Sequence, residues 1–235
     1  AAKESLPQRK TDVLSREERD QLLTRVNTNV AASLANPKSL EKCLFKMKKN
    51  RAPGVDGLSV EHLISIFYTG NGSKFVKDQL VHEYVILLQK FLTGNLSSYQ
   101  AEVFYSLKLA GIPKDSTECR VIMMVGLHSK VAFSLVSSSK FKKKVQSEAF
   151  SSNQAGAMSA GAECLIHGAQ SVLLQCPHFD FLSADAYKAY YNMNRDLALD
   201  TLKKTFPEVF NMFMQKYDNN ANAFISGMRE GVVNL

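Results

Sequence analysis

Residues 185–191 read DAYKAYY, and this stretch decides how the rest of the chain is interpreted. It follows a short apolar run and precedes a polar helix start, so the sequence predicts a β-strand over 179–185. Asp185 at the end of that strand, with the backbone carbonyl of Ala186, offers two of the hard oxygen ligands that Mg²⁺ prefers. A lone Asp at a strand end is more often a cap or turn residue, so this interpretation depends on the flanking sequence.

The side chains that follow Asp185 suit a nucleotide. Ala189 is small enough to leave room beside a sugar, and Tyr190 is large and rigid enough to screen the 2′ position of that sugar. Phosphoryl transfer onto a 3′-hydroxyl depends largely on bound divalent ions. One carboxylate and one carbonyl are too few ligands to complete such a metal site. The stretch therefore indicates part of a site that uses Mg²⁺ or Mn²⁺.

Composition narrows the class of protein. The chain has 235 residues, of which 45% are hydrophobic, and this predicts a packed globular protein. The net charge of +7 favours a polyanionic partner, although a basic surface without one fits the charge as well. The beginning lacks the apolar core of a signal peptide, and no window is apolar enough to span a membrane. We therefore expect a soluble intracellular protein of the nucleus or cytoplasm, with buried free thiols at its four cysteines, 43, 119, 164 and 176.

The N-terminal half has the periodicity of helices. A capping box at 15–18 and apolar spacing up to Leu34 predict the first helix, and further helices are predicted over 39–49, 59–68 and 75–92. The second helix would expose a positive face made of Lys42, Lys46, Lys48 and Lys49. Between the helices predicted over 39–49 and 59–68, residues 51–57 (RAPGVDG) have the composition of a turn, with two glycines that can take positive φ.

The C-terminal half mixes strands and helices. Alternating residues over 107–112, a turn at 113–116 and a β-prone run over 120–125 predict an antiparallel hairpin. Helices are expected over 129–145 and 160–174, then from about 194 and 207, and a last strand over 221–226. The predicted fold class is therefore α+β.

Four segments in series resemble reverse transcriptases of the non-LTR retrotransposon and group II intron type. Residues 185–190 look like the first catalytic motif of that family, and residues 48–59 (KKNRAPGVDGLS) are similar to the opening of its fingers. Ile-Pro-Lys at 112–114 followed by Arg-Val-Ile at 120–122 resembles its fingers hairpin, and residues 154–167 resemble its Gln-x-Gly, Gly-Ala-Glu and His segment. The resemblance covers roughly residues 38–235 and implies a right-hand polymerase fold.

The resemblance also implies roles for single residues. Lys114 and Arg120 match the fingers cations that grip the incoming deoxynucleoside triphosphate, and Tyr190, beside Ala189, matches the gate that excludes ribonucleotides. Residues 227–231 (GMREG) look like the segment beneath the template base and the incoming nucleotide, which would include Glu230 and Gly231. Without the family context, the two hairpin cations would be a solvated turn.

Other residues would contact the RNA template and the DNA primer. Gln154 and Gly156 match a segment near the template strand, with a helix-entry loop as the alternative interpretation. The densest positive run, Lys142, Lys143 and Lys144, fits a template contact and a solvated helix face equally well.

The chain also departs from the family. Glu230 stands where Gln is usual, Tyr191 where Asp or Asn is usual in retrotransposon enzymes, and Val121 where Pro is usual. The second carboxylate pair of the family, which follows the Gln-Gly segment, is not among these 235 residues. We therefore expect this chain alone to lack polymerase activity.

The expected organisation follows from the same comparison. It consists of an N-terminal extension helix over 1–37, fingers over 38–178 and a partial palm over 179–235. The alternative, from a different class, is a non-catalytic RNA-binding remnant or a domesticated domain that keeps the fingers and binds RNA through its lysines.

Overall fold

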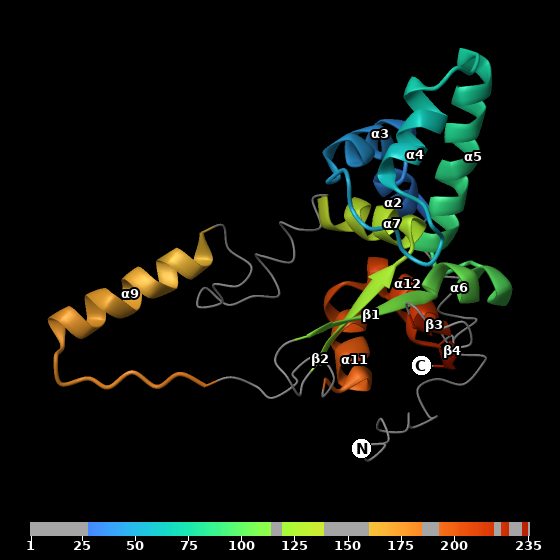
Figure 1. Cartoon of the computed structure of the whole chain (residues 1–235). Helices are drawn as coiled ribbons and strands as arrows, with labels where there is room; N and C mark the ends of the chain where they lie inside the picture. Colours follow the sequence, from blue (N-terminus) through green and yellow to red (C-terminus); the bar gives the residue numbers. More distant parts are fainter. Residues whose placement is uncertain are drawn as a thin grey trace.

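A computed structural model describes residues 28–113, 119–138, 160–184, 193–218, 222–225 and 232–234. The predicted α+β class is confirmed: a helical body packs beside a four-stranded sheet (Figure 1). The helices are α2 (Thr28–Leu34), α3 (Pro37–Lys46), α4 (Val60–Ile64), the π-helix η1 (Ser65–Thr69), α5 (Lys74–Leu92), α6 (Ser98–Tyr105), α7 (Leu127–Ser138), α9 (Gly161–Gln175), α11 (Arg195–Thr205) and α12 (Pro207–Asp218). The strands are β1 (Leu107–Pro113), β2 (Cys119–Val125), β3 (Asn222–Ile225) and β4 (Val232–Asn234).

Side-chain caps set where several helices begin. The Asn36 side chain accepts a hydrogen bond from the Ser39 amide at 2.9 Å, so α3 begins at Pro37, earlier than the predicted start at 39. The helix also ends earlier, at Lys46 rather than at 49. Ser97 and Gln100 form a capping box that starts α6, a helix that the sequence analysis did not predict.

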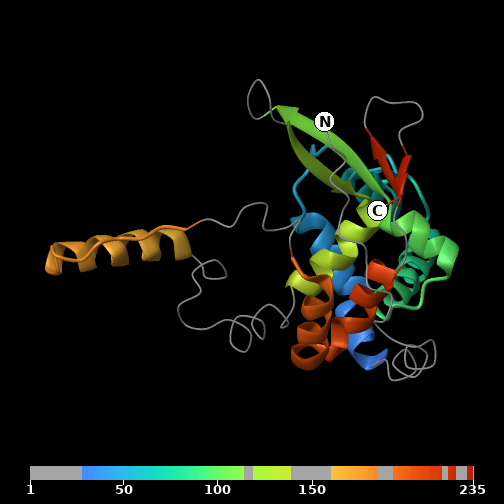
Figure 2. The ribbon, with the colours of Figure 1, turned by 90° about the horizontal axis from the view of Figure 1, so that it is seen from below.

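The sheet has the order β2-β1-β3-β4. Strands β1 and β2 form the predicted antiparallel hairpin, in register from Leu107 opposite Val125 to Pro113 opposite Cys119. Strand β3, which was also predicted, pairs with β1 in parallel. Strand β4 pairs with β3 and runs antiparallel to it (Figure 2). The parallel pairing of β1 with β3 and the existence of β4 were not predicted.

One predicted strand is wrong. Residues 179–184, which were expected to form a strand leading into Asp185, lie outside every strand of the described sheet. Their apolar side chains remain in solvent, since Phe181 is 63% and Leu182 92% exposed. A strand exists through pairing with a neighbour, and the described part of this segment has no sheet partner. Asp185 itself lies outside the described residues.

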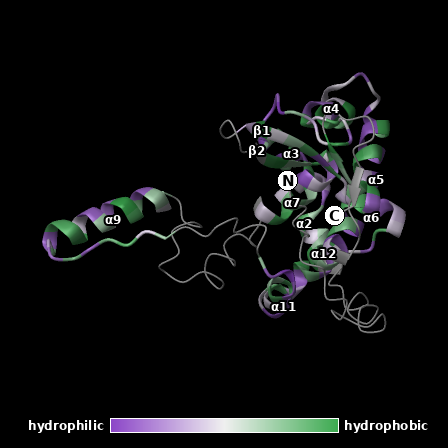
Figure 3. Cartoon of the chain, turned by 60° about the horizontal axis from the view of Figure 1, so that its bottom comes forward, coloured by the Kyte–Doolittle hydropathy of each residue, from purple (hydrophilic) through white to green (hydrophobic). Residues whose placement is uncertain are grey.

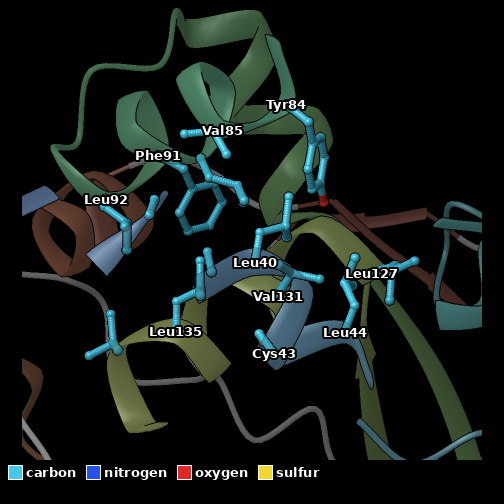
Figure 4. Packing of buried hydrophobic residues seen from close by; sticks show 14 of the residues in the cluster. Leu40, Cys43, Leu44, Tyr84, Val85, Phe91, Leu92, Leu127, Val131 and Leu135 are labelled. Carbon is cyan, nitrogen blue, oxygen red and sulfur yellow. The ribbon is translucent and has the colours of Figure 1, made fainter. Parts of the chain in front are cut away.

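A single large core holds the helical body together. Phe91 is 2% exposed, and it belongs to one packed cluster with Leu40 and Leu44 of α3 and with Val131 and Leu135 of α7 (Figure 4). The core continues into α12, which contributes Val209 and Met212. It thus takes residues from both sides of the boundary predicted at 178/179, and the division into fingers and palm stays a prediction.

Helix α12 is also fixed to the body by hydrogen bonds. The Gln215 side-chain amide donates to the Leu96 carbonyl at 2.7 Å, and the Tyr105 hydroxyl donates to the Met212 carbonyl at 3.2 Å. Helices α11 and α12 also pack against each other, and the buried side chains between them form a small second cluster: Leu199, Phe210 and Met214. The polar bonds set the position of α12 along the body, which apolar packing alone does not.

Helix α9 differs from the other helices because it stands away from the body in both ribbon views (Figures 1 and 2). Hydrophobic and hydrophilic residues are interspersed along it (Figure 3), and Leu165, Ile166 and Val172 are each about half exposed. It also carries Cys164, which is exposed, so the expectation of buried thiols is wrong there but holds for Cys43. In the described part of the chain, no helix is both long and apolar enough to cross a membrane.

Candidate functional site

The β1–β2 hairpin is the first candidate element, because Arg120, one of the two cations predicted to bind the triphosphate, belongs to β2. The backbone of Arg120 is paired with Ile112, one register step before the last pair, Pro113 with Cys119. Near this end the apolar residues Ile112 and Val121 are about half exposed, so the hairpin projects from the body into solvent. Lys114 follows the last paired residue and lies outside the described residues, as does the rest of the turn.

The base of the hairpin packs against the loop over residues 51–57, which was predicted to be a turn. Gly54 is buried, and a Cβ there would collide with the backbone carbonyl of Val125, the last residue of β2. Of the two glycines in this loop, Gly57 takes positive φ, at 67°, and Gly54 does not. Glycine is needed at 54 because two backbones touch there.

Asp56 makes the second contact of this loop. Its Oδ2 accepts a hydrogen bond from the Leu127 amide at 2.5 Å, and its Oδ1 accepts one from the Leu58 amide at 3.2 Å. Leu127 is the first residue of α7, and Gly126 before it has no side chain with which to cap the helix. A Cβ at Gly126 would lie 2.8 Å from Oδ2 of Asp56. The carboxylate thus caps α7 from a distant part of the chain and sits at the positive end of the helix.

Asp56→Ala is expected to lower the free energy of unfolding by about 1–3 kcal/mol, because two amides lose their acceptor and one helix loses its cap. Urea unfolding followed by circular dichroism measures the change. Asp78→Ala is the matched control, since Asp78 is exposed on α5, and its effect should stay within about 0.5 kcal/mol. Equal stability of the two variants would contradict the capping role.

A polar pair lies next to this cap. Nδ1 of His128 lies 3.0 Å from the Tyr84 hydroxyl, and the Phe104 ring packs edge-on against the imidazole at 5.2 Å between centroids. Burial lowers the pKa of His128, which the nearby charge of Asp56 opposes only in part, and burial also raises the pKa of Tyr84. The imidazole is therefore neutral at pH 7 and forms part of the packed interior.

This neutral imidazole predicts a pH dependence of stability. The unfolded chain takes up a proton at His128 near pH 6.5, whereas the folded chain does so only at lower pH. The contribution of the neutral His128 to the free energy of unfolding is thus fully present above about pH 6.5, and it is lost as the pH falls below that value. The free energy of unfolding of His128→Gln, measured between about pH 7 and pH 5, should fall less than that of the wild type. His82→Gln, which changes an exposed histidine on α5, should follow the wild type; parallel curves for all three proteins would refute the assignment.

Most of the other predicted site residues belong to segments that the structure does not describe. Those of the catalytic motif and the nucleotide pocket, and those near the template, lie outside the described residues: Asp185, Ala186, Ala189, Tyr190, Glu230, Gly231, Gln154, Gly156, Lys142, Lys143 and Lys144. Arg195, at the start of the helix after the catalytic motif, is described, and its guanidinium lies 5.9 Å from the centre of the Tyr217 ring. Within the described ranges no three His, Cys, Asp or Glu side chains gather to hold a metal ion.

Comparison with known proteins found no match: no family model matches the chain, and no curated protein matches it. The residues that join the loop 51–58 to the hairpin are the best-defined candidate element, and sequence reasoning missed one of them, Gly126. The Pro-Gly-x-Asp-Gly pattern did single out Gly54 and Asp56, although as turn residues and not as partners of β2 and α7.

Proposed function

We propose that the chain is the fingers and the first part of the palm of an RNA-directed DNA polymerase of the non-LTR retrotransposon or group II intron type. The observation that carries the proposal is the order of four motif-like segments, at 48–59, 112–122, 154–167 and 185–190. Two of these segments also belong to one structural unit, because Gly54 and Asp56 of the first pack where the hairpin of the second enters α7. A chance match to two unrelated motifs would not require them to meet.

The cations of the hairpin would bind the incoming deoxynucleoside triphosphate. Arg120 lies toward the projecting end of β2, and Lys114 follows the end of β1 in the chain. A guanidinium suits two phosphate oxygens at once, whereas an ammonium acts as a point charge. The packed base of the hairpin would keep its orientation while the far end contacts the nucleotide.

The chemical step would depend on the catalytic motif. Asp185 and the carbonyl of Ala186 would hold Mg²⁺ or Mn²⁺, which when bound neutralises charge on the phosphates and activates the 3′-hydroxyl. Tyr190 would exclude the 2′-hydroxyl of ribonucleotides, Ala189 would leave room for the sugar, and Glu230 and Gly231 would lie beneath the template base. An enzyme of this kind would act inside the cell, in the nucleus or cytoplasm, on an RNA template with a DNA primer.

The second candidate is an RNA-binding protein without polymerase activity. It keeps the fold and the basic surface and needs no second carboxylate pair. An exposed run of six cations at 38–51 favours nucleic-acid binding as such and is compatible with both candidates.

Primer extension distinguishes the two. The longest reading frame that contains these 235 residues is expressed and given an RNA template, a DNA primer, Mg²⁺ and either deoxynucleotides or ribonucleotides. The polymerase proposal expects templated extension with deoxynucleotides only. RNA binding without any extension would favour the second candidate, and extension with ribonucleotides alone would overturn the assignment to reverse transcriptases.

A further inference from the structure

The most strongly charged surface among the described residues lies on α3 and the turn that follows it. Between residues 38 and 51 the chain has six cations and one acid, Glu41. All six cations are exposed, and we call this set the basic run: Lys38, Lys42, Lys46, Lys48, Lys49 and Arg51. The positive face predicted from the sequence is thus confirmed as an exposed surface.

The helix geometry puts three of these cations on one stripe. Lys38, Lys42 and Lys46 are spaced four residues apart, so they follow one another along one side of α3. The opposite side carries Leu40, which is fully buried in the core. The stripe therefore faces away from the described helical body.

The turn after α3 is held in place by the carboxylate of Glu61, whose negative charge also acts on Lys49. Asn50 adopts a left-handed conformation with φ 55°, and its amide donates a hydrogen bond to Oε1 of Glu61 at 2.6 Å. This bond lowers the pKa of Glu61, so the carboxylate is ionised at neutral pH and committed to the turn. The turn thus has a defined shape, and Lys48, Lys49 and Arg51 project from it.

An aromatic side chain lies within the basic run. Phe45 is 46% exposed, although Phe is usually buried, and its ring packs against Tyr68 at 5.6 Å between centroids. On α3 it is the neighbour of Lys42 and Lys46, and the contact with Tyr68 from η1 holds the ring in place. A fixed, half-exposed ring among cations is the arrangement on which proteins stack bases of single-stranded nucleic acid.

The basic run also leads to the loop described above. Arg51 is followed after two residues by Gly54, which contacts the end of β2. A nucleic-acid strand bound along α3 would therefore continue toward the base of the β1–β2 hairpin. This continuity distinguishes the run from an isolated solvated helix face.

We propose that the basic run binds the phosphate backbone of single-stranded nucleic acid and that Phe45 stacks on one of its bases. The inference requires no polymerase chemistry and stands if the chain only binds RNA. A surface that bound duplexes would use the same lysines but would gain nothing from Phe45, because paired bases do not offer a free face.

The test is fluorescence anisotropy of a labelled oligouridylate over a series of KCl concentrations, with EDTA and without nucleotides. Each phosphate contact contributes about 0.7 to the slope of log affinity against log salt. The variant Lys42→Ala/Lys46→Ala/Lys49→Ala should therefore bind more weakly and with a slope lower by about 2. The control is Lys90→Ala/Lys203→Ala/Lys204→Ala, which removes three exposed lysines elsewhere and should keep the wild-type slope. Equal slopes for the two variants would overturn the proposal.

Phe45 is tested with the same oligonucleotide. Phe45→Ala should weaken binding by about fivefold or more without changing the salt slope, and Phe45→Tyr should restore it. The same change should leave binding to an A–U duplex unaltered. Unchanged single-strand binding by Phe45→Ala, or equal losses on single strand and duplex, would overturn the single-strand assignment.

A footprint on the wild-type protein avoids any effect of substitution on folding. Lysine acetylation with and without the oligonucleotide, followed by mass spectrometry, should show protection of Lys42, Lys46 and Lys49. Lys90 and Lys204 should react equally in both samples. Protection of the second group alone would overturn the proposal.

Discussion

Asp185→Asn is expected to lower RNA-templated primer extension by about a thousandfold or more in the reading frame that contains this chain. The exchange keeps the size of the side chain and removes the charge that would hold the metal ion. Stabilisation of the transferring phosphates by a bound metal is worth several kcal/mol, and about 4 kcal/mol corresponds to a thousandfold in rate. The measurement is the single-turnover rate of adding one deoxynucleotide.

The control for this prediction is Asp196→Asn. Asp196 lies in the first turn of α11, shortly after the catalytic motif in the chain, and has no proposed role with metal. Both variants should bind template and primer as the wild type does, so a loss of rate in Asp185→Asn alone would locate the defect in the chemical step. Extension at the wild-type rate by Asp185→Asn would refute the role of Asp185.

Phe91→Ala is expected to lower the free energy of unfolding by about 3–5 kcal/mol. Phe91 is almost fully buried at the end of α5, and its ring contacts Phe104 and Phe133 edge-on at 6.2 and 6.1 Å and Tyr105 at 5.2 Å. These rings come from two helices, α6 and α7, so the cavity left by the exchange cannot close by a shift of one element. Domains are stable by only about 5–15 kcal/mol, so the variant should be close to unfolding at room temperature.

Phe75→Ala is the matched control, because Phe75 lies on the same helix and is 77% exposed. Its free energy of unfolding should stay within about 0.5 kcal/mol of the wild type. Urea unfolding at one temperature measures both variants. Similar losses for the two phenylalanines would show that the core is not centred on Phe91.

Local signals predicted those parts of the fold that depend on neighbouring residues. The apolar spacing over 75–92 and the turn signal at 113–116 predicted α5 and the hairpin, because both are stabilised within one short stretch. Helix α6 was missed although Ser97 and Gln100 form its capping box, since eight residues give too little periodicity to stand out. The strand predicted at 179–185 failed in its described part because an apolar run becomes a strand only beside a partner.

The candidate site was predicted less well than the fold, for a physical reason. Asp56 was identified as a turn residue, yet its carboxylate accepts a hydrogen bond from the amide of Leu127, 71 residues further along the chain. No pattern within 51–58 reveals that partner, and nothing around Gly126 shows that its helix needs a cap from elsewhere. The lysines of α3, by contrast, were predicted as an exposed face, because helical spacing alone decides which side of a helix leaves the core.

The parallel pairing of β1 with β3 has a consequence for biosynthesis. Leu107 and Ala223 are neighbours in the sheet, so β1 and β3 can pair only after the whole chain between them has been translated. Until residues 222–225 emerge from the ribosome, the nascent hairpin carries a free edge of amide and carbonyl groups beside a finished helical body. A chaperone that shields this edge during synthesis would raise the yield of the protein without acting on its native state.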